Sequence, residues 1–308
     1  MRSARSLYRF NVALGALGGL SLLLAGAVAV RAVRFDTTSV ASVLEACREL
    51  VTVPSVSVTV VAAIGGLSLV VFGRATRSLA RHMHARVRLM RGLRHIDELT
   101  IDGVTVRLLE HSRPQAFCAG FLRPRVYLST GVLEQLDEGE LRAVVAHERH
   151  HQARRDPLRI LAAEVLADAL FFAPMLRRLR ERYGALAELA ADEAAVRRSG
   201  GDAAPLASAL LSFGTTEDPS VVVGIAPERV DHLLGRPPRW ELPLSLVATG
   251  LVGIGASVSL ALGTAAALDP GAVRLSALVL ELCMAAMVML PAAAAIWALG
   301  SWARRALA

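Results

Sequence analysis

The sequence predicts a mainly α-helical membrane protein with about four transmembrane helices and an α+β domain on the cytosolic side of the membrane. The chain is 54% hydrophobic and 20% charged, which is more apolar than a soluble domain of 308 residues needs to be. Its apolar residues gather in long runs near both ends, and the middle carries the shorter patterns of strands and amphipathic helices. We therefore expect a transmembrane hairpin over 1–75, a cytosolic domain over 76–242 and a second hairpin over 243–308.

The N-terminal hairpin is predicted from two apolar runs, 11–30 and 56–72. The first run is uncharged and, at about 20 residues, long enough to span a bilayer. Arg2, Arg5 and Arg9 precede it, so a cleaved signal peptide is the alternative interpretation. A retained helix is preferred because the run is longer than the usual core of a signal peptide.

The charge pattern around these runs predicts the topology. The net charge is +7 and the sequence has no lysine, so arginine carries all of the fixed positive charge. The stretch 73–94 is rich in arginine and contains no acid, which is typical of the cytosolic side. The N-terminus and the chain from Arg74 onward are then cytosolic, and 31–55 lies outside. Nucleic-acid binding is the alternative for these arginines, but no interleaved aromatic residues support it, so we expect contact with the lipid bilayer instead.

Three short β-rich segments are predicted at the start of the cytosolic domain, at 104–109, 116–120 and 125–130. Turn-forming residues bound them: Gly103, Pro114, Gly120 and Pro124. We expect a small sheet that packs beside the helix that follows. An exposed edge strand of such a sheet can bind an extended peptide, and the sequence leaves open which strand forms the edge.

A helix is predicted over about 137–156. Asp137 and Glu140 form a capping-box pattern at its start. Pro157 disfavours helical backbone in the residue before it, so the helix is expected to end at about Asp156. An apolar face on its first turns is formed by Leu141, Val144 and Val145.

This helix carries His147, Glu148 and His151 in the pattern H-E-x-x-H. Residues four apart lie on one helix face about one turn apart, so both imidazoles can bind one Zn²⁺. Glu148 follows the first histidine directly, where its carboxylate can take the proton of a water molecule at the metal. The alternative is a charged helix surface that carries histidines by chance.

A third ligand is expected from the segment 187–200. Its helical pattern places Glu188 and Asp192 one turn apart beside small alanines that let helices approach closely. We assign Glu188 as the third zinc ligand and Asp192 as a carboxylate that orients a ligating histidine. A solvated acidic face is the alternative for an isolated pair of this kind.

The apolar stretch 158–176 is expected to be a packed core helix or one lying at the membrane surface. Glu164 and Asp168 near its middle would be costly against lipid. A single crossing there would also place His151 and Glu188 on opposite membrane faces, where they could not share a metal.

The remaining chain contains a polar connection over 197–242 and two apolar runs, 244–268 and 272–299. Within the connection, Arg229 or His232 could donate a hydrogen bond to a developing oxyanion, or each could belong to a surface helix. The two runs are long enough to form a second transmembrane hairpin, which places both termini in the cytosol.

The combined motifs over about 100–235 resemble the BlaR/MecR-type membrane gluzincin metallopeptidases, and more distantly the HtpX and CAAX prenyl protease group. The resemblance rests on AFCAGFLRPRVYLSTGVLEQLDEGELRAVVAHERHHQARRD followed by ELAADEAAV. It implies a gluzincin-like domain with zinc ligands His147, His151 and Glu188 and the base Glu148. It further implies that Asp156 either supports the metal site or caps a helix.

The resemblance implies a zinc metalloendopeptidase of the cell membrane. Its expected partner is a protein or peptide substrate, such as a winged-helix transcriptional repressor in the cytosol, and direct nucleic-acid binding is not expected. Degradation of membrane proteins and a non-catalytic sensor or scaffold are the alternatives. The BlaR/MecR transducers continue into an extracellular penicillin-binding domain that does not follow here, so β-lactam sensing is not expected.

Overall fold

The computed structural model describes most of the chain, namely residues 4–35, 41, 44, 56–92, 94–214, 229, 244–267, 269–271 and 273–279. The molecule divides into two compact units by its contacts. One unit consists of Met1–Ala16 and Gly73–Gly253, and the other of Leu17–Phe72 and Ile254–Ala308.

The unit of Leu17–Phe72 and Ile254–Ala308 is built from apolar helices. It includes parts of α1 (Ala4–Ala32), α3 (Val56–Gly92) and α10 (Leu244–Ala267). Its core is made of small and β-branched side chains that include Ala25, Ala29, Val58, Val61, Ile64 and Ala261.

Two short strands also belong to this unit. β1 (Val33–Arg34) pairs in parallel with β6 (Val273–Arg274). Val273 is fully buried and belongs to the same core as the helices.

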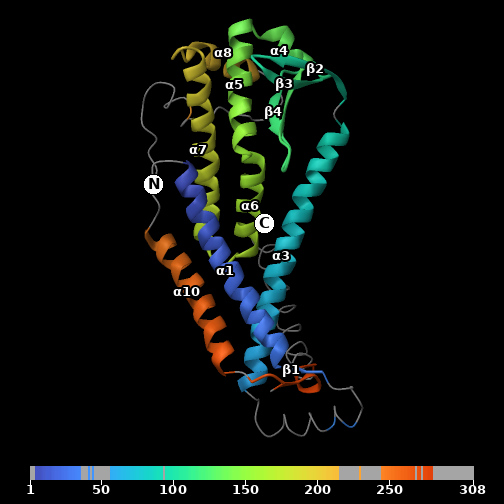
Figure 1. Cartoon of the computed structure of the whole chain (residues 1–308), viewed down its shortest axis with the longest axis vertical. Coiled ribbons are helices and arrows are strands. Elements are labelled where there is room, and N and C mark those ends of the chain that lie inside the picture. The colour runs from blue at the N-terminus through green and yellow to red at the C-terminus, as the bar shows by residue number, and fades with distance from the viewer. Residues whose placement is uncertain are drawn as a thin grey trace, which may run out of the picture. The chain divides into compact units, whose positions relative to one another are not determined.

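Three helices of the described residues, α1, α3 and α10, contain stretches long and apolar enough to cross a membrane. They correspond to the first three apolar runs predicted from the sequence. The fourth predicted run, 272–299, lies mostly outside the described residues. α3 has 37 residues and continues without a break through the arginine-rich stretch, so the apolar run and the basic stretch share one helix (Figure 1).

The other unit contains a four-stranded sheet of β2 (His95–Ile101), β3 (Val104–Leu109), β4 (Ala116–Ala119) and β5 (Arg125–Ser129). The strand order is β2-β3-β5-β4, with β3 and β5 parallel and the other neighbours antiparallel. The three predicted strands are confirmed. β2 was not predicted, because most of its side chains are exposed and it lacks a clear apolar face.

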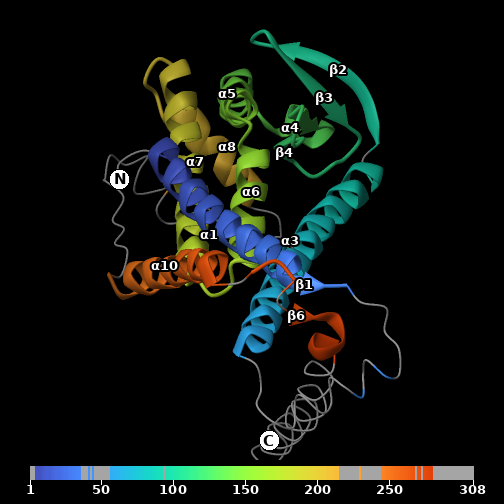
Figure 2. The same ribbon diagram turned by 60° about the horizontal axis from the view of Figure 1, so that its bottom comes forward.

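Helices pack beside this sheet. A short helix, α4 (Thr130–Gln135), leads to α5 (Glu138–Arg154) and α6 (Asp156–Ala169), and α7 (Pro174–Arg198) and α8 (Ala204–Gly214) follow. Two views show α7 alongside α5 and the sheet on the other side of α5 (Figures 1 and 2).

The predicted capping box at the start of α5 is confirmed. Asp137 Oδ1 accepts a hydrogen bond of 2.8 Å from the Glu140 amide, and Glu140 Oε2 accepts one of 3.0 Å from the Asp137 amide. These two bonds satisfy amide groups that the first turn of a helix leaves unpaired.

The predicted end of this helix at Asp156 was wrong by two residues. Arg155 adopts left-handed backbone, with φ of 54°, and breaks the helix after Arg154. Asp156 and Pro157 instead form the first turn of α6, where proline needs no amide partner. This sharp joint places Asp156 close to the end of α5.

The apolar stretch 158–176 is divided between α6 and the start of α7. Its two acids are paired. Glu164 lies 3.1 Å from Arg180 on α7 and 3.0 Å from His82 on α3. Asp168 accepts hydrogen bonds of 2.7 Å from Ser78 and 2.6 Å from Arg81, both on α3. The contacts fit the prediction of a packed helix and show how the acids are accommodated.

Candidate metal centre

The centre of the site is formed by two histidines on α5. His147 and His151 are four residues apart, and both side chains are buried. Their Nε2 atoms lie 3.1 Å apart, with the ring planes at 71°. The helix thus directs one nitrogen of each ring to the same point, as the sequence predicted.

Glu188 on α7 completes a group of three. Its two carboxylate oxygens lie 3.5 Å from the Nε2 atoms of His147 and His151, respectively. Ligand atoms of the three side chains all lie within 4.8 Å of one another. The close approach of the two helices is made possible by small residues, because Ala146 on α5 and Ala195 on α7 belong to one buried cluster.

These residues fit a zinc ion in both chemistry and geometry. Zinc favours tetrahedral sites with metal-to-nitrogen distances of about 2.0–2.1 Å, which places ligand atoms about 3.3 Å apart. The observed separations of 3.1 and 3.5 Å bracket that value. Three protein ligands are one fewer than a closed structural zinc site has, as is typical of catalytic sites.

Each histidine is held from behind by an aspartate. On the first side, His147 Nδ1 lies 3.0 Å from Asp192 Oδ1, and the Asp192 side chain is fully buried. Arg229 binds the same carboxylate through both oxygens, with Nε 2.9 Å from Oδ2 and Nη2 2.6 Å from Oδ1. Arg229 also reaches Glu188, at 3.4 Å. We call His147, Asp192 and Arg229 the arginine arm.

On the second side, His151 Nδ1 is hydrogen-bonded to Asp156 Oδ2 at 3.0 Å. Tyr183 on α7 donates its hydroxyl to Asp156 Oδ1 at 2.7 Å. Burial would raise the pKa of Asp156, but the hydrogen bonds to His151 and Tyr183 outweigh it and lower that pKa. We call His151, Asp156 and Tyr183 the tyrosine arm.

The sequence predicted both aspartates but not the groups that hold them. Tyr183 has the pattern of an ordinary core aromatic residue on a helix, so nothing in the sequence distinguished it. Arg229, one of two candidates for a hydrogen bond to an oxyanion, lines the pocket and pairs with Asp192 and Glu188, and contact with an oxyanion stays a prediction. His232 lies outside the described residues.

The model of the family described as BlaR1 peptidase M56 matches residues 43–232, which is more than half of the chain. The chain belongs to the BlaR1 peptidase M56 family. This confirms the resemblance to the BlaR/MecR-type membrane metallopeptidases, and the matched segment contains every residue of the two arms. No curated protein and no solved structure matches the chain. Together with the apolar helices, M56 membership indicates a membrane metallopeptidase.

The electrostatics of the M56 site favour a cation. Burial lowers the pKa of His147, but Asp192 and Glu188 outweigh this effect and raise it to about 9. Burial raises the pKa of Asp192, but His147 and Arg229 lower it to about 2. Glu188 follows the same pattern, because the nearby histidines lower its pKa against the effect of burial. Glu188 therefore stays ionised beside the two Nε2 atoms, and Asp192 stays ionised behind His147.

Glu148 behaves differently from Glu188. Its burial raises its pKa, although His147 and His151 and the Cys118 amide lower it in part. A raised pKa makes a carboxylate a better proton acceptor, which suits Glu148 to accept a proton and return it. The neighbouring Cys118 thiol has its pKa raised to about 12, first by burial and then by Glu148, so it stays protonated.

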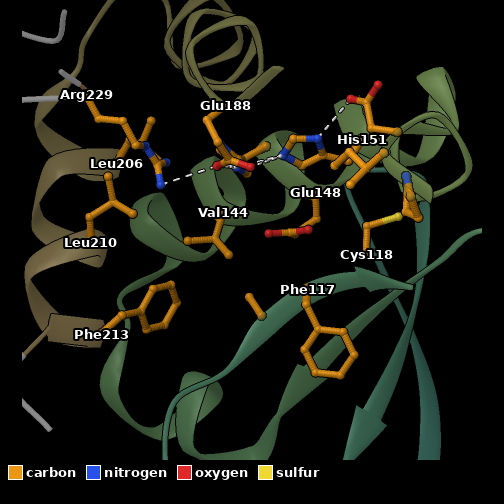
Figure 3. Close-up of a pocket in the computed structure, with 15 residues that line it drawn as sticks. Phe117, Cys118, Val144, Glu148, His151, Glu188, Leu206, Leu210, Phe213 and Arg229 are labelled. Carbon is orange, nitrogen blue, oxygen red and sulfur yellow. Dashed lines mark hydrogen bonds and ion pairs between the residues drawn. The ribbon is translucent and has the colours of Figure 1, made fainter. Parts of the chain in front are cut away.

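A pocket opens in front of these groups (Figure 3). Glu148 and Glu188 line it together with both histidines. Leu206, Leu210 and Phe213 lie on one side of the pocket, and Phe117 and Cys118 on strand β4 lie on the other. The site therefore combines a polar floor with apolar walls, which is typical of binding sites for peptides and small molecules.

Proposed function

We propose that this M56 protein is a membrane zinc endopeptidase that hydrolyses peptide bonds with Glu148 as general base. The observation that carries the proposal is the convergence of His147, His151 and Glu188 on one point beside Glu148, at the floor of a pocket. His147, His151 and Glu188 would hold the zinc ion. When bound there, zinc supplies a Lewis acid that polarises the scissile carbonyl and acidifies water.

The chain's own residues supply the proton transfers and the positioning. Glu148 takes a proton from the attacking water and returns it to the departing amine, as its raised pKa allows. Asp192 and Asp156 hold the histidine rings by their Nδ1 atoms, so that Nε2 is left to face the metal.

The sheet provides a place for an extended substrate. β4 is at the end of the strand order, pairs with β5 on one side and contributes Ala116, Phe117 and Cys118 to the pocket. Its outer edge has no strand partner among the described residues. A substrate segment that adds to this edge would pass directly in front of Glu148.

The family and the charge pattern support a proposal for the cellular role. A regulatory protease that cuts a cytosolic winged-helix repressor fits M56 membership, and the arginine-rich half of α3 supports a cytosolic active site. Four spans with both termini inside belong to this proposal. Mass-spectrometric identification of new protein N-termini in cells with the active chain or Glu148→Gln would test the role. Fragments of a DNA-binding repressor are expected; fragments of membrane proteins alone would point to quality control instead.

The chemistry is tested with the full chain purified in detergent, with zinc content and hydrolysis of a quenched fluorescent peptide mixture as readouts. The unmodified chain should hold about one zinc ion and cleave peptides. Glu148→Gln should keep the zinc and lose at least about a thousandfold in hydrolysis. Glu134→Gln, an exposed acid outside the pocket, is the matched control. Full hydrolysis by Glu148→Gln would overturn the base, and absence of zinc from the unmodified chain would favour the scaffold alternative.

A further inference from the structure

We propose that Tyr183 is a positioning residue for the metal ligand His151 and that Tyr8 on α1 holds Tyr183 in place, so that zinc affinity depends on the seating of the N-terminal end of α1. This step depends on the zinc site proposed above. It assigns to the first apolar helix a structural connection to the metal centre.

The hydrogen bonds of the tyrosine arm connect Tyr183 to His151 through Asp156. Tyr183 has no exposed surface, and its hydroxyl donates to Asp156 Oδ1 at 2.7 Å. The other oxygen of Asp156 binds His151 Nδ1 at 3.0 Å. Because one carboxylate joins the two side chains, a shift of the Tyr183 ring shifts the orientation of the His151 ring. Carboxylates and their partners behind a ligating histidine commonly set metal affinity in this way.

Tyr8 on α1 packs against the ring of Tyr183. The Tyr8 ring lies 5.1 Å from the Tyr183 ring, centroid to centroid, with the planes tilted by 43°. The Arg159 guanidinium also lies over the Tyr8 ring, with its Cζ atom 5.4 Å from the ring centroid. Arg159 in turn lies 3.9 Å from Asp156 Oδ1. Tyr8 is thus in contact with two residues that each approach the aspartate behind His151.

The end of α1 that carries Tyr8 is seated within the same compact unit as the metal centre. Leu7 and Asn11 next to it are buried. At Gly15, an added Cβ would come within 2.8 Å of the Leu166 side chain on α6, so the glycine permits a close approach of the two helices. Tyr8 therefore lies on a packed face of α1.

Ordinary core packing is the competing explanation, and it makes a different prediction for the hydroxyl. If Tyr183 only fills space, Tyr183→Phe preserves its role because the ring remains. If Tyr183 positions Asp156, the same substitution removes the donor and loosens His151. The proposed role of Tyr8 depends on its ring and not on its hydroxyl. Tyr8→Phe should therefore leave zinc affinity unchanged, and Tyr8→Leu should lower it.

The experiment uses the full chain purified in detergent, with Zn²⁺ affinity measured by chelator competition. The visible absorption spectrum of the Co²⁺-loaded protein is a second readout, because it reports ligand geometry without any turnover. Tyr183→Phe should weaken zinc binding by about tenfold and alter the Co²⁺ spectrum. Tyr8→Leu should shift both readouts in the same direction by a smaller amount. Tyr8→Phe and the control Leu20→Ala, whose side chain is 64% exposed on α1, should match the unmodified chain.

A double substitution separates a connected path from two independent effects. Once Tyr183→Phe has removed the hydroxyl, adding Tyr8→Leu should weaken zinc binding less than it does in the unmodified chain, because only the contact through Arg159 still connects Tyr8 to Asp156. Equal weakening in both backgrounds, or unchanged affinity and spectrum in Tyr183→Phe, would overturn the proposal while leaving the zinc peptidase intact. An unmodified chain that binds no zinc would instead overturn the proposed function itself.

Discussion

The two histidines of the metal centre are held in unlike ways, although both direct Nε2 to the same point. In the arginine arm, the aspartate behind His147 is paired with a guanidinium through both oxygens. In the tyrosine arm, the aspartate behind His151 takes a hydroxyl on its free oxygen, and the nearest guanidinium nitrogens are 3.9 Å and 4.0 Å away. The first arm is fixed mainly by charge and the second mainly by a neutral hydrogen bond.

The arms also connect the site to different parts of the chain. Arg229 comes from the far end of the M56 match, and Tyr183 contacts α1 at the beginning of the chain. Both arms meet on α7, which carries Tyr183, Glu188 and Asp192. This helix therefore connects both Tyr8, near the N-terminus, and Arg229, near the end of the M56 match, to the metal centre.

The largest expected effect comes from removing the charge of the arginine arm. Arg229→Ala leaves Asp192 buried without its guanidinium, and breaking a buried pair in this way costs about 3–5 kcal/mol. We expect a loss of that order in the free energy of unfolding, measured by denaturant titration of the metal-free protein in detergent. Arg197→Ala, which removes an exposed pair with Glu193, is the control and should change stability by less than about 0.5 kcal/mol. A loss below about 1 kcal/mol for Arg229→Ala would show that the arginine arm is not held by charge.

The aspartates allow the arms to be compared directly at the metal. Asp192→Asn and Asp156→Asn keep the side-chain shape and remove the charge that orients each histidine. Each should weaken zinc binding by about 10–100-fold in chelator competition. Asp202→Asn, an exposed aspartate that follows α7, should leave the affinity unchanged. An effect in one arm alone would mean that a single histidine dominates metal binding.

The site could be predicted from the sequence where its geometry is local. His147 and His151 share a face because of helix spacing, and the capping box depends on two residues three apart. Glu188 and Asp192 were likewise predicted to share a helix face, because they are four residues apart. The contacts of Arg229 and Tyr8 join residues 37 and 175 positions apart in the chain. Glu188 is equally far from His151, but the need for a third zinc ligand and the family resemblance pointed to it, whereas no motif indicated the partners of Arg229 and Tyr8.

The errors in the fold have similar causes. β2 has polar, exposed side chains on both faces, so the alternation that revealed the other strands is missing. The end of α5 was misplaced because it is set by the left-handed backbone of Arg155, a conformation that arginine does not favour and that its sequence context does not indicate.

The pH dependence of metal binding provides a finer test of the arginine arm. Metal-free His147 has its pKa raised to about 9 and is therefore protonated near neutrality. Zinc needs the neutral ring, so binding releases this proton, and the apparent affinity should rise about tenfold per pH unit between pH 7 and pH 9. Because Asp192 helps to raise this pKa, Asp192→Asn should move the rise to lower pH. Isothermal titration calorimetry in buffers of different ionisation enthalpy would count the released protons, and an affinity independent of pH would contradict the raised pKa.

The smallest expected effect lies on α1 beside the tyrosine arm. Asn11 is completely buried, and both polar atoms of its side chain lack a hydrogen-bond partner among the described residues. An unpaired buried amide costs about 1–3 kcal/mol, and leucine has a similar size without that cost. Asn11→Leu should therefore raise the free energy of unfolding of the metal-free protein by about 1 kcal/mol. If α1 supports His151 through Tyr8, more stable packing of the helix should leave zinc affinity equal to that of the unmodified chain or higher. If Asn11→Leu stabilises the protein but lowers its zinc affinity, the metal centre requires the less stable packing of α1 that Asn11 causes.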